Sequence, residues 1–325
     1  MKKIYLLFIA VGTLVSCGEN GEENERVLSD SSGNINNLSV IVDNDLWQGE
    51  VGEAIRENLA SPVDGLPQDE PLFSISQMPP EAFSGFTRKN RIFLKIEKGQ
   101  AGDIKVGNNL YAKPQTGVVV KGQTNEEIAS LINQNAENII KAFKRTEINE
   151  KQRRISKSLK EDERLKQELG VSLKFPDAYR YAKDEEGFFW IRKDIPNGSM
   201  EIMVYEVPLN TIQRDSNIVG NIIKMRDSIG EQHIPGPVDG SYMITEAAYA
   251  PYLFNSEIDN KFAYETKGTW EVNDAYMGGP FLNYAVLDEE NNRFVILEGF
   301  AFAPSARKRD NMFELEAILK SAKIK

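Results

Sequence analysis

A long stretch from Thr124 to Leu169 has the hydrophobic pattern of a helix, and it divides the chain. From Lys144 onward the apolar positions thin out and Lys, Arg and Glu fill the places between them, so we expect that half to be largely solvated. The pattern is typical of a spacer or brace across a domain surface, and the alternative is a partner-binding coiled coil with an irregular repeat. Its first half predicts one buried stripe, because apolar residues recur at three- and four-residue spacing: Ile128, Leu131, Ile132, Ile139, Ile140 and Phe143.

Shorter apolar segments on both sides of this helix predict strands and further helices. Thr124, followed three residues later by Glu127, predicts a capping box at the start of the long helix. Before it, we expect strands at 38–42, 91–97 and 116–121, a helix at about 46–59, and a proline-rich loop at 62–80. After it, we expect strands at 171–175, 188–192 and 201–207, a helix at 216–229, two hairpins with turns at 267–268 and 288–292, and a closing helix at 305–322.

This order of elements predicts an α+β fold. Hairpins followed by a closing helix favour two units of largely antiparallel sheet covered by helices and joined by the long charged helix. The expected division is a signal peptide at 1–16, a flexible acidic tether at 17–37, a first unit at 38–123, the long helix at 124–170 and a second unit at 171–325. The sequence Pro-Val-Asp-Gly occurs at 62–65 and again at 237–240, which indicates either a duplicated unit or a chance repeat of common turn residues.

The N-terminus predicts a lipid anchor. Lys2 and Lys3 precede an apolar run from Ile4 to Leu14, which at 11 residues is too short for a stable membrane span. The residues Leu14, Val15, Ser16 and Cys17 have the form of a bacterial lipobox, so Cys17 is the predicted lipidation site and the predicted attachment to a membrane. The acidic residues behind Cys17 are either a surface-export signal or a solvated linker. We expect an outer-membrane lipoprotein, with the leaflet undecided.

Composition restricts the chemistry of the chain, because it contains one Cys and one His. No internal disulfide can form, and the usual Cys and His sets for structural zinc are unavailable. The net charge is −10, and removal of Met1 to Ser16 leaves 37 basic and 49 acidic residues, a charge of −12. Such a balance argues against nucleic acid as a partner. We predict neither a metal nor a cofactor.

His233 is the candidate for acid–base catalysis, because it lies before a Pro and Gly turn and near Asp239 in sequence. The alternative is a surface or turn histidine, since the chain has no Gly-x-Ser-x-Gly elbow to supply a nucleophile. Carboxylates at Asp43 with Asp45, or in the run 184–186, are suited to calcium or to a glycosidase dyad, but Asp and Glu are also common at helix caps and turns.

A cluster of aromatic residues beside glycines is the candidate ligand site. Trp270, Asp274, Tyr276 and Phe281 lie close together in sequence around Gly278 and Gly279, and such residues can form a shallow platform for a sugar or a peptide. The alternative is that they pack as the core of a hairpin under the covering helices.

Several segments together resemble a known family of lipoproteins. They are Leu38 to Asp45 with Trp47, Pro62 to Phe73, Gly236 to Glu246, Gly268 to Phe281 and Glu298 to Lys308. In these segments nearly the whole mature chain is similar to the lipoproteins of the Bacteroidota grouped as domain of unknown function 4837. This resemblance implies an envelope location and no activity. The order of elements from Val171 onward is also weakly similar to the PsbP-like α/β/α sandwich, without a site to carry over.

From these observations we expect a non-enzymatic binding or assembly factor in the cell envelope, with an envelope protein or a glycan as its partner. The alternative is an extracytoplasmic hydrolase that uses His233 or a carboxylate pair.

Overall fold

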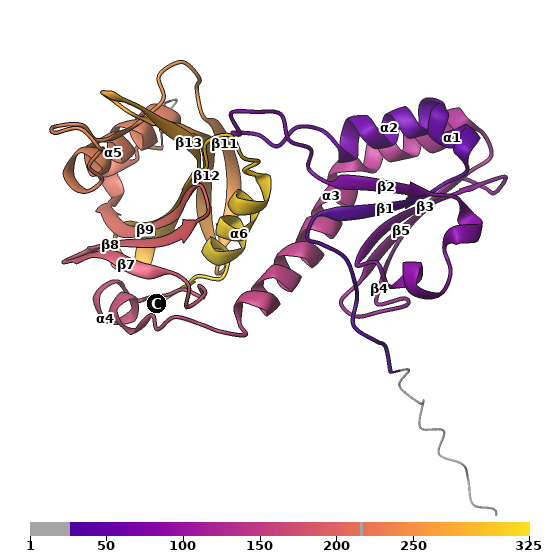
Figure 1. Ribbon diagram of the computed structural model, residues 1–325, viewed down its shortest axis with the longest axis horizontal. Helices are drawn as coiled ribbons and strands as arrows, with labels where there is room; N and C mark the ends of the chain where they lie inside the picture. Colours follow the sequence, from indigo (N-terminus) through magenta and orange to yellow (C-terminus); the bar gives the residue numbers. More distant parts are fainter. Residues whose placement is uncertain (1–26, 215–216) are drawn as a thin grey trace, which may run out of the picture.

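The structure, a computed structural model, describes residues 27–214 and 217–325. The predicted signal peptide, Cys17 and the first part of the predicted tether lie outside the described residues, as does Ser216 at the predicted start of a helix. The described chain forms two units side by side, and the long helix α3 lies on the face of the first unit that is turned toward the second (Figure 1). Within the described ranges, no helix combines the length and the apolar character that a membrane span requires.

The first unit is built on a five-stranded sheet in the order β2-β1-β3-β5-β4. Its strands are β1 (Asn37–Ile41), β2 (Ser74–Met78), β3 (Ile92–Lys98), β4 (Asp103–Asn108) and β5 (Thr116–Gly122). Its helices are α1 (Asn44–Gln48), α2 (Glu50–Leu59) and α3 (Asn125–Ile155), with short 3-10 turns η1 (Pro80–Ala82) and η2 (Gly85–Lys89). Val51 and Ile55 of α2 share a buried core with Ile128 and Ile132 of α3.

The second unit is built on an eight-stranded sheet in the order β10-β12-β13-β14-β9-β8-β7, in which β11 also pairs with β12. Its strands are β7 (Arg180–Glu185), β8 (Phe188–Ile195), β9 (Gly198–Pro208), β10 (Met243–Thr245), β11 (Tyr252–Ile258), β12 (Lys261–Val272), β13 (Ala275–Asp288) and β14 (Arg293–Phe302). Around it lie α4 (Glu163–Leu169), α5 (Ile218–His233), α6 (Arg309–Leu319), the turns η3 (Leu209–Thr211) and η4 (Glu289–Asn291), and the small sheet of β6 (Val171–Ser172) with β15 (Lys323–Ile324).

The α+β class is confirmed, and the two units differ in how their strands pair. In the second unit every strand pair is antiparallel among the described residues, as predicted. In the first unit, β1 pairs in parallel with β2 and with β3, β3 pairs in parallel with β5, and β4 with β5 is the antiparallel pair. The helices α1 and α2 carry the chain from β1 back to the start of β2, and such a crossover makes consecutive strands parallel.

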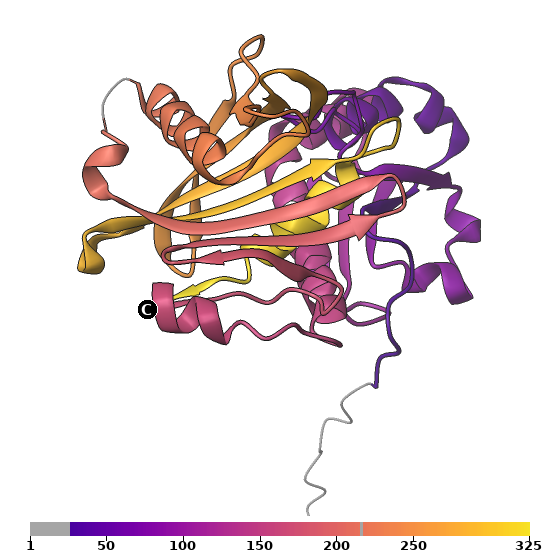
Figure 2. The same ribbon diagram turned by 60° about the vertical axis from the view of Figure 1, so that its left-hand side comes forward.

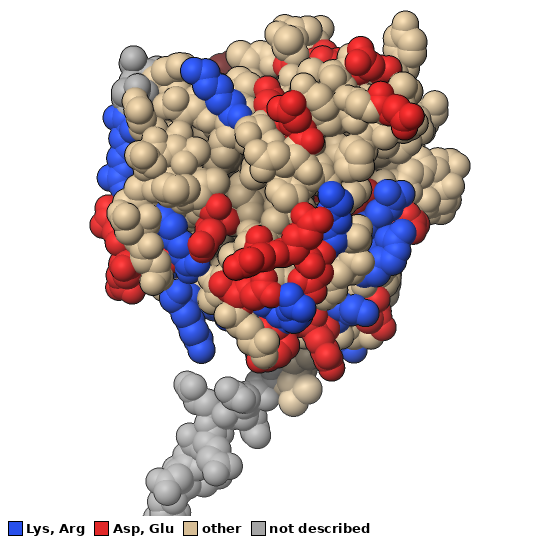
Figure 3. Space-filling model, turned by 90° about the vertical axis from the view of Figure 1, so that its left-hand side faces the viewer, with Lys and Arg blue, Asp and Glu red and all other residues tan. Residues whose placement is uncertain are grey.

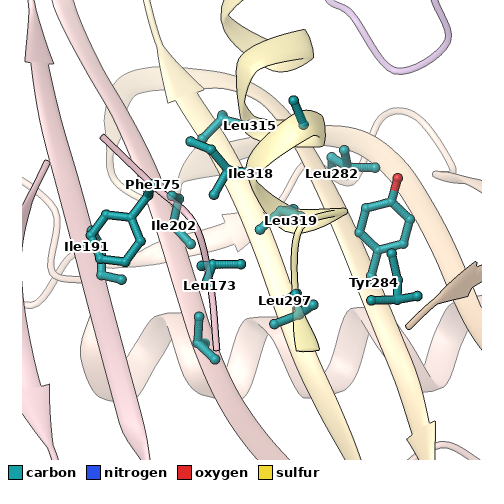
Figure 4. Close-up of a cluster of buried hydrophobic side chains, with 14 of the residues drawn as sticks. Leu173, Phe175, Ile191, Ile202, Leu282, Tyr284, Leu297, Leu315, Ile318 and Leu319 are labelled. Atoms are coloured by element: carbon teal, nitrogen blue, oxygen red, sulfur yellow. The ribbon is translucent and has the colours of Figure 1, made fainter. Parts of the chain in front are cut away.

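Both faces of the large sheet are covered, as Figure 2 shows. Leu315, Ile318 and Leu319 of α6 pack over Leu282 and Leu297 of the sheet (Figure 4). Ile222 and Met225 of α5 belong to a separate cluster with Phe281 and Phe294. Phe281 and Leu282 are neighbours in sequence but lie in different cores, because successive side chains of a strand point to opposite faces.

The long helix begins as predicted and ends earlier. The Thr124 side chain accepts a hydrogen bond from the Glu127 amide at 3.2 Å, which confirms Thr124 as the N-cap. The predicted capping box is only half formed, because Glu127 Oε2 accepts from the Gln123 amide at 2.6 Å instead of from the Thr124 amide. The helix ends at Ile155 instead of continuing to residue 170, and α4 follows as a separate helix. Ile155 is buried in the core of the second unit. The Lys160 amide donates to the Phe175 carbonyl at 3.0 Å, so the chain after Ile155 leaves the helix and runs beside the segment around Phe175.

The charged half of α3 is less solvated than its composition predicts. Glu147 is fully buried and receives Arg91 Nε at 2.8 Å, Arg91 Nη2 at 3.1 Å and the Asn36 amide at 2.8 Å. Glu150 is also buried and binds Arg153 and Arg154 on its own helix. The expectation of a largely solvated half was wrong, because this part of α3 lies between the two units and its carboxylates pair with Arg91 of the first unit and with arginines of α3 itself.

Two further predictions differ from the structure. The chain continues as one strand, β12, through Lys267 and Gly268, and the turn before it lies at Asp259 and Asn260, whose φ angles are 52° and 60°. Two consecutive positive φ angles are typical of a two-residue type I′ hairpin. The two units are not a duplication, because their strand orders and pairing directions differ.

Candidate functional site

The loop between α2 and β2 extends from the first unit onto the second (Figure 1). It is held closed by the Val63 amide, which donates to the Glu70 carbonyl at 2.9 Å. At its tip Gly65 has a φ of +81°, and a Cβ atom there would lie 2.9 Å from Lys267 Cβ and 3.0 Å from the Gly268 nitrogen. Glycine alone combines this backbone conformation with so close an approach. The loop tip is therefore fixed against β12.

Glu70 of the same loop binds the N-terminus of α6. Its carboxylate is buried and accepts the Lys308 amide at 2.6 Å and the Arg309 amide at 3.1 Å. These amides are unpaired by the helix itself, and the positive end of the helix dipole favours a carboxylate there. Arg309 Nη1 donates in return to the Pro71 carbonyl at 3.0 Å. A side chain from the first unit thus caps the N-terminus of a helix in the second unit. This contact holds the two units in one orientation.

A second contact between the units joins α3 to α6. Lys144 Nζ lies 3.1 Å from Glu316 Oε1, and Gln152 Nε2 donates to the Ala317 carbonyl at 2.9 Å. Burial by itself would raise the pKa of Glu316, but Lys144 and Lys320 hold it well below its usual range. The carboxylate is therefore ionised at neutral pH, and the contact is a partly buried ion pair with Lys320 as a further lysine beside it.

Two cavities lie beside these contacts and share the loop segment 63–66 as a wall. The inner cavity has a volume of about 80 Å³, which is enough for a few water molecules. Its walls are mainly apolar and include five charged side chains, which are Asp64, Lys144, Lys267, Arg309 and Glu316. The outer cavity is a cleft of about 550 Å³, within the range of small-ligand sites.

The outer cleft is acidic and aromatic. Asp64 and Asp69 line it from the first unit, and Glu246, Tyr249 and Tyr252 line it from the second. Tyr249 is 71% exposed and Tyr252 is 51% exposed, so both rings are available to a ligand. Within the described residues, no Lys or Arg forms an ion pair with the three carboxylates. The cleft therefore offers negative charge and flat apolar surface, a combination that suits a cation.

The predicted aromatic platform is distributed over two places. Trp270 is 3% exposed and meets Phe300 edge-on, with ring centroids 5.4 Å apart, and Phe281 is buried in the same core. Asp274 lies in the turn between β12 and β13, and Tyr276 is fully exposed beside it. The structure does not bring the four residues onto one surface, and the alternative of a hairpin core describes Trp270 and Phe281.

Trp270 also borders a small cavity of about 70 Å³ at the end of the sheet. On its wall the Trp190 indole donates to Glu201 Oε2 at 2.8 Å, and Arg192 Nε lies 3.6 Å from Glu201 Oε1. Burial raises the pKa of Glu201. Because this carboxylate already has partners within the protein, we assign it a structural role.

His233 pairs with a different carboxylate from the one predicted. Its Nδ1 atom lies 2.9 Å from Glu185 Oε2, and its ring stacks on Phe188 with centroids 3.9 Å apart. Asp239 is exposed in the turn that follows. Neither His233 nor Glu185 lines the two cavities between the units.

The remaining predicted carboxylates lie at the start of a helix or in an ion pair. Asp43 precedes α1 and Asp45 lies in its first turn. Asp184 binds Arg164 at 2.9 Å. In residues 27–214 and 217–325, no three His, Cys, Asp or Glu side chains are grouped as metal ligands.

A buried ion pair in the large sheet escaped the sequence analysis. Arg226 of α5 donates to both oxygens of Glu298 on β14 at 2.8 and 2.6 Å, and Asn283 Nδ2 donates to Glu298 Oε2 at 2.8 Å. Both charged side chains are almost completely buried. A single acid inside the apolar run of β14 was a signal that a buried partner exists, but the identity of Arg226 depends on how α5 packs.

Comparison with known families gives two matches. A model described as a domain of unknown function (DUF4837) matches residues 158–321, and a second, described as a domain of unknown function (DUF8532), matches residues 31–156. The resemblance stated from the sequence therefore applies to the second unit, and the segments before residue 158 belong to the other match. The boundary between the matches falls just after α3 ends. No curated protein matches the chain.

Proposed function

Given that the chain belongs to the family described as a domain of unknown function (DUF4837), we propose that it is a lipid-anchored envelope protein that binds a ligand without altering it chemically. The lipobox around Cys17 supports the anchor. The acidic and aromatic cleft between the units supports binding. The ligand we propose carries positive charge and a flat apolar surface, and it is a segment of an envelope polymer.

One observation carries this proposal: Asp64, Asp69 and Glu246 line one cleft beside two exposed tyrosines, and among the described residues no Lys or Arg forms an ion pair with them. Three carboxylates within one concave surface attract cations more strongly than the same charges spread over a surface. Tyrosine rings add cation–π contacts and apolar area. The hydrolase alternative gains no support from the geometry, because His233 faces Glu185 away from this cleft.

The cleft is held in a fixed shape, which favours binding over chemistry that requires closure. Gly65 seats the loop on β12, and Glu70 holds the same loop on α6. A preformed cleft loses less conformational entropy when a ligand binds. We therefore expect the affinity for a cation to depend on the three carboxylates and on the tyrosines rather than on any movement of the units.

The test measures binding of trilysine and of an oligomer of glucosamine to the full-length chain in detergent. In the variant with Asp64→Asn, Asp69→Asn and Glu246→Gln, we expect about tenfold weaker binding, since three exposed charge contacts at roughly 0.5 kcal/mol each give about that factor. The matched control changes three exposed acids elsewhere, Glu57→Gln, Glu231→Gln and Glu290→Gln, and so alters the net charge equally. Equal loss in both variants would show that only net charge matters, and the cleft would be rejected.

The anchor has its own test. We expect radiolabelled palmitate to be incorporated into the wild-type chain and not into Cys17→Ala, which would also move from the membrane fraction to the soluble one. A Cys17→Ala protein that stays with the membrane would contradict lipid anchoring.

A further inference from the structure

We infer that β11 is an acceptor strand, to which an extended basic peptide adds as a further strand of the large sheet. This inference rests on the proposed function, because the added strand leads into the acidic cleft. It identifies the ligand class of that cleft as polypeptide.

The outer side of β11 has unpaired backbone groups. Ile258 and Lys261 flank the two-residue turn at Asp259 and Asn260, and a pair in that position exchanges both hydrogen bonds of the ladder. Counting back in steps of two, Ser256, Phe254 and Tyr252 also bond to β12. The residues between them, Leu253, Asn255 and Glu257, therefore direct their N–H and C=O groups outward. In the described part of the chain, no hydrogen bond reaches these outward groups from another element.

This edge has few of the features that normally prevent pairing. Edge strands are usually protected by lysines, prolines or bulges. The segment Tyr252–Ile258 contains no Lys and no Pro, and its register with β12 is regular over its whole length. Tyr252 and Phe254 are half exposed on one side of the strand, with rings parallel and 6.4 Å apart. A partner strand would find both backbone groups and an apolar surface there.

The charges near β11 indicate what kind of strand it accepts. Tyr252, at the start of β11, also lines the outer cleft, so an added strand extends directly toward Asp64, Asp69 and Glu246. Glu257, near the other end of β11, is exposed as well. The nearby Lys267 is 2.7 Å from Glu265, which neutralises it. Basic side chains on the added strand therefore meet acids at both ends.

The decisive variant is Asn255→Pro, which removes one outward N–H and places a ring on the free edge while leaving the ladder to β12 intact. The probe is a capped short peptide of alternating lysine and valine, titrated against the full-length chain in detergent. We expect about tenfold weaker binding for Asn255→Pro and a change below about twofold for Asn255→Ala, which keeps the N–H. Unchanged thermal unfolding of Asn255→Pro shows that the strand itself has been preserved.

A complementary test alters the peptide. Methylation of alternate peptide nitrogens on the side that faces β11 should reduce binding about as much as Asn255→Pro, while methylation of the other set should not. This comparison remains valid if Asn255→Pro fails to fold.

The outcomes separate this inference from the proposed function. If Asn255→Pro and the methylated peptides bind normally while the three-acid variant binds poorly, strand addition is overturned and the acidic cleft stands. If the wild-type chain binds the glucosamine oligomer but not the peptide, strand addition is likewise overturned and the acidic cleft stands. If the three-acid variant binds normally and Asn255→Pro does not, the strand stands and the cleft is rejected. If the wild-type chain is a dimer and Asn255→Pro is a monomer, β11 pairs with a second copy of this chain. That result would overturn the proposal that its partner is a basic peptide.

Discussion

Two edge strands of the large sheet are built in opposite ways: β7 at one edge, and β11, which shares the other edge with β10. β7 reads Arg-Tyr-Ala-Lys-Asp-Glu, and its register with β8 shifts between Tyr181 and Lys183. It is also covered, because Arg164 of α4 binds Asp184 and the Tyr181 hydroxyl donates to the Glu161 carbonyl at 3.0 Å. On the side of the molecule where β7 lies, acidic and basic side chains are interspersed (Figure 3). β11 is regular and aromatic, and within the described residues no hydrogen bond from another segment reaches its outer backbone groups.

This difference shows that an open edge is a property of one strand rather than of the fold. Both strands are about equally long and belong to the same sheet. One has charges, a register shift and an overlying segment, which are the usual protections against pairing with another chain. The other lacks them at the place where an acidic cleft opens. We therefore connect the open edge with binding, and the protected edge with solubility.

The largest expected effect compares two neighbouring positions of β11. Phe254→Pro removes an N–H that bonds to β12, and we expect it to lower the free energy of unfolding by about 3 kcal/mol. Asn255→Pro removes an N–H that faces outward, and we expect a loss below about 1 kcal/mol. Urea denaturation of both variants measures the difference. Equal losses would mean that the outward assignment of Asn255 is incorrect.

A smaller effect is expected where the chain covers β7. Asp162 accepts hydrogen bonds from Ser172 Oγ at 2.7 Å and from the Leu173 amide at 3.0 Å, and it pairs with Lys166 at 2.7 Å. We expect Asp162→Ala to lower the free energy of unfolding by about 1 kcal/mol, whereas Glu163→Ala, at an exposed neighbouring position, should have almost no effect.

The Asp162 contribution should depend on pH. Burial alone would raise its pKa, but the bonds from Lys166, Ser172 and Leu173 lower it below the ordinary value of 3.8. A carboxyl group with a lowered pKa stabilises the fold above its unfolded pKa and loses this effect as the pH falls. The difference between wild type and Asp162→Ala should therefore be full at neutral pH and shrink below about pH 3.8. A difference that grows in acid would contradict the assignment.

The smallest expected effect compares one hydroxyl at each edge. Tyr181→Phe removes the bond to the Glu161 carbonyl and should cost about 0.5 to 1 kcal/mol of unfolding free energy. Tyr252→Phe, on the open edge, should leave stability unchanged because its ring is half exposed. Thermal unfolding of the two variants provides the measurement. A larger loss for Tyr252→Phe would show that the open edge is held by contacts other than those to β12.

Sequence reasoning was accurate where the relevant residues are close together in the chain. The Thr124 cap of the long helix, the buried stripe of α3 and the hairpin of β13 and β14 all depend on residues a few positions apart. It was less accurate for the cleft. Asp64 and Glu246 gave no signal of being neighbours, and the aromatic residues selected by their proximity in sequence, Trp270 and Phe281, pack in a core.

The sequence by itself determined the α+β class and the start of the long helix, because these follow from periodicity and from short motifs. Lipidation at Cys17 stays a prediction from the same kind of motif. The tertiary structure decided that the first sheet is mainly parallel, that α3 ends at Ile155, and that the loop of Gly65 and Glu70 joins the two units. It also decided which strand edge stays open. Strand pairing and burial depend on contacts between residues far apart in the chain. A local pattern of hydrophobic and polar residues does not identify the distant segment with which a strand or a buried side chain makes contact.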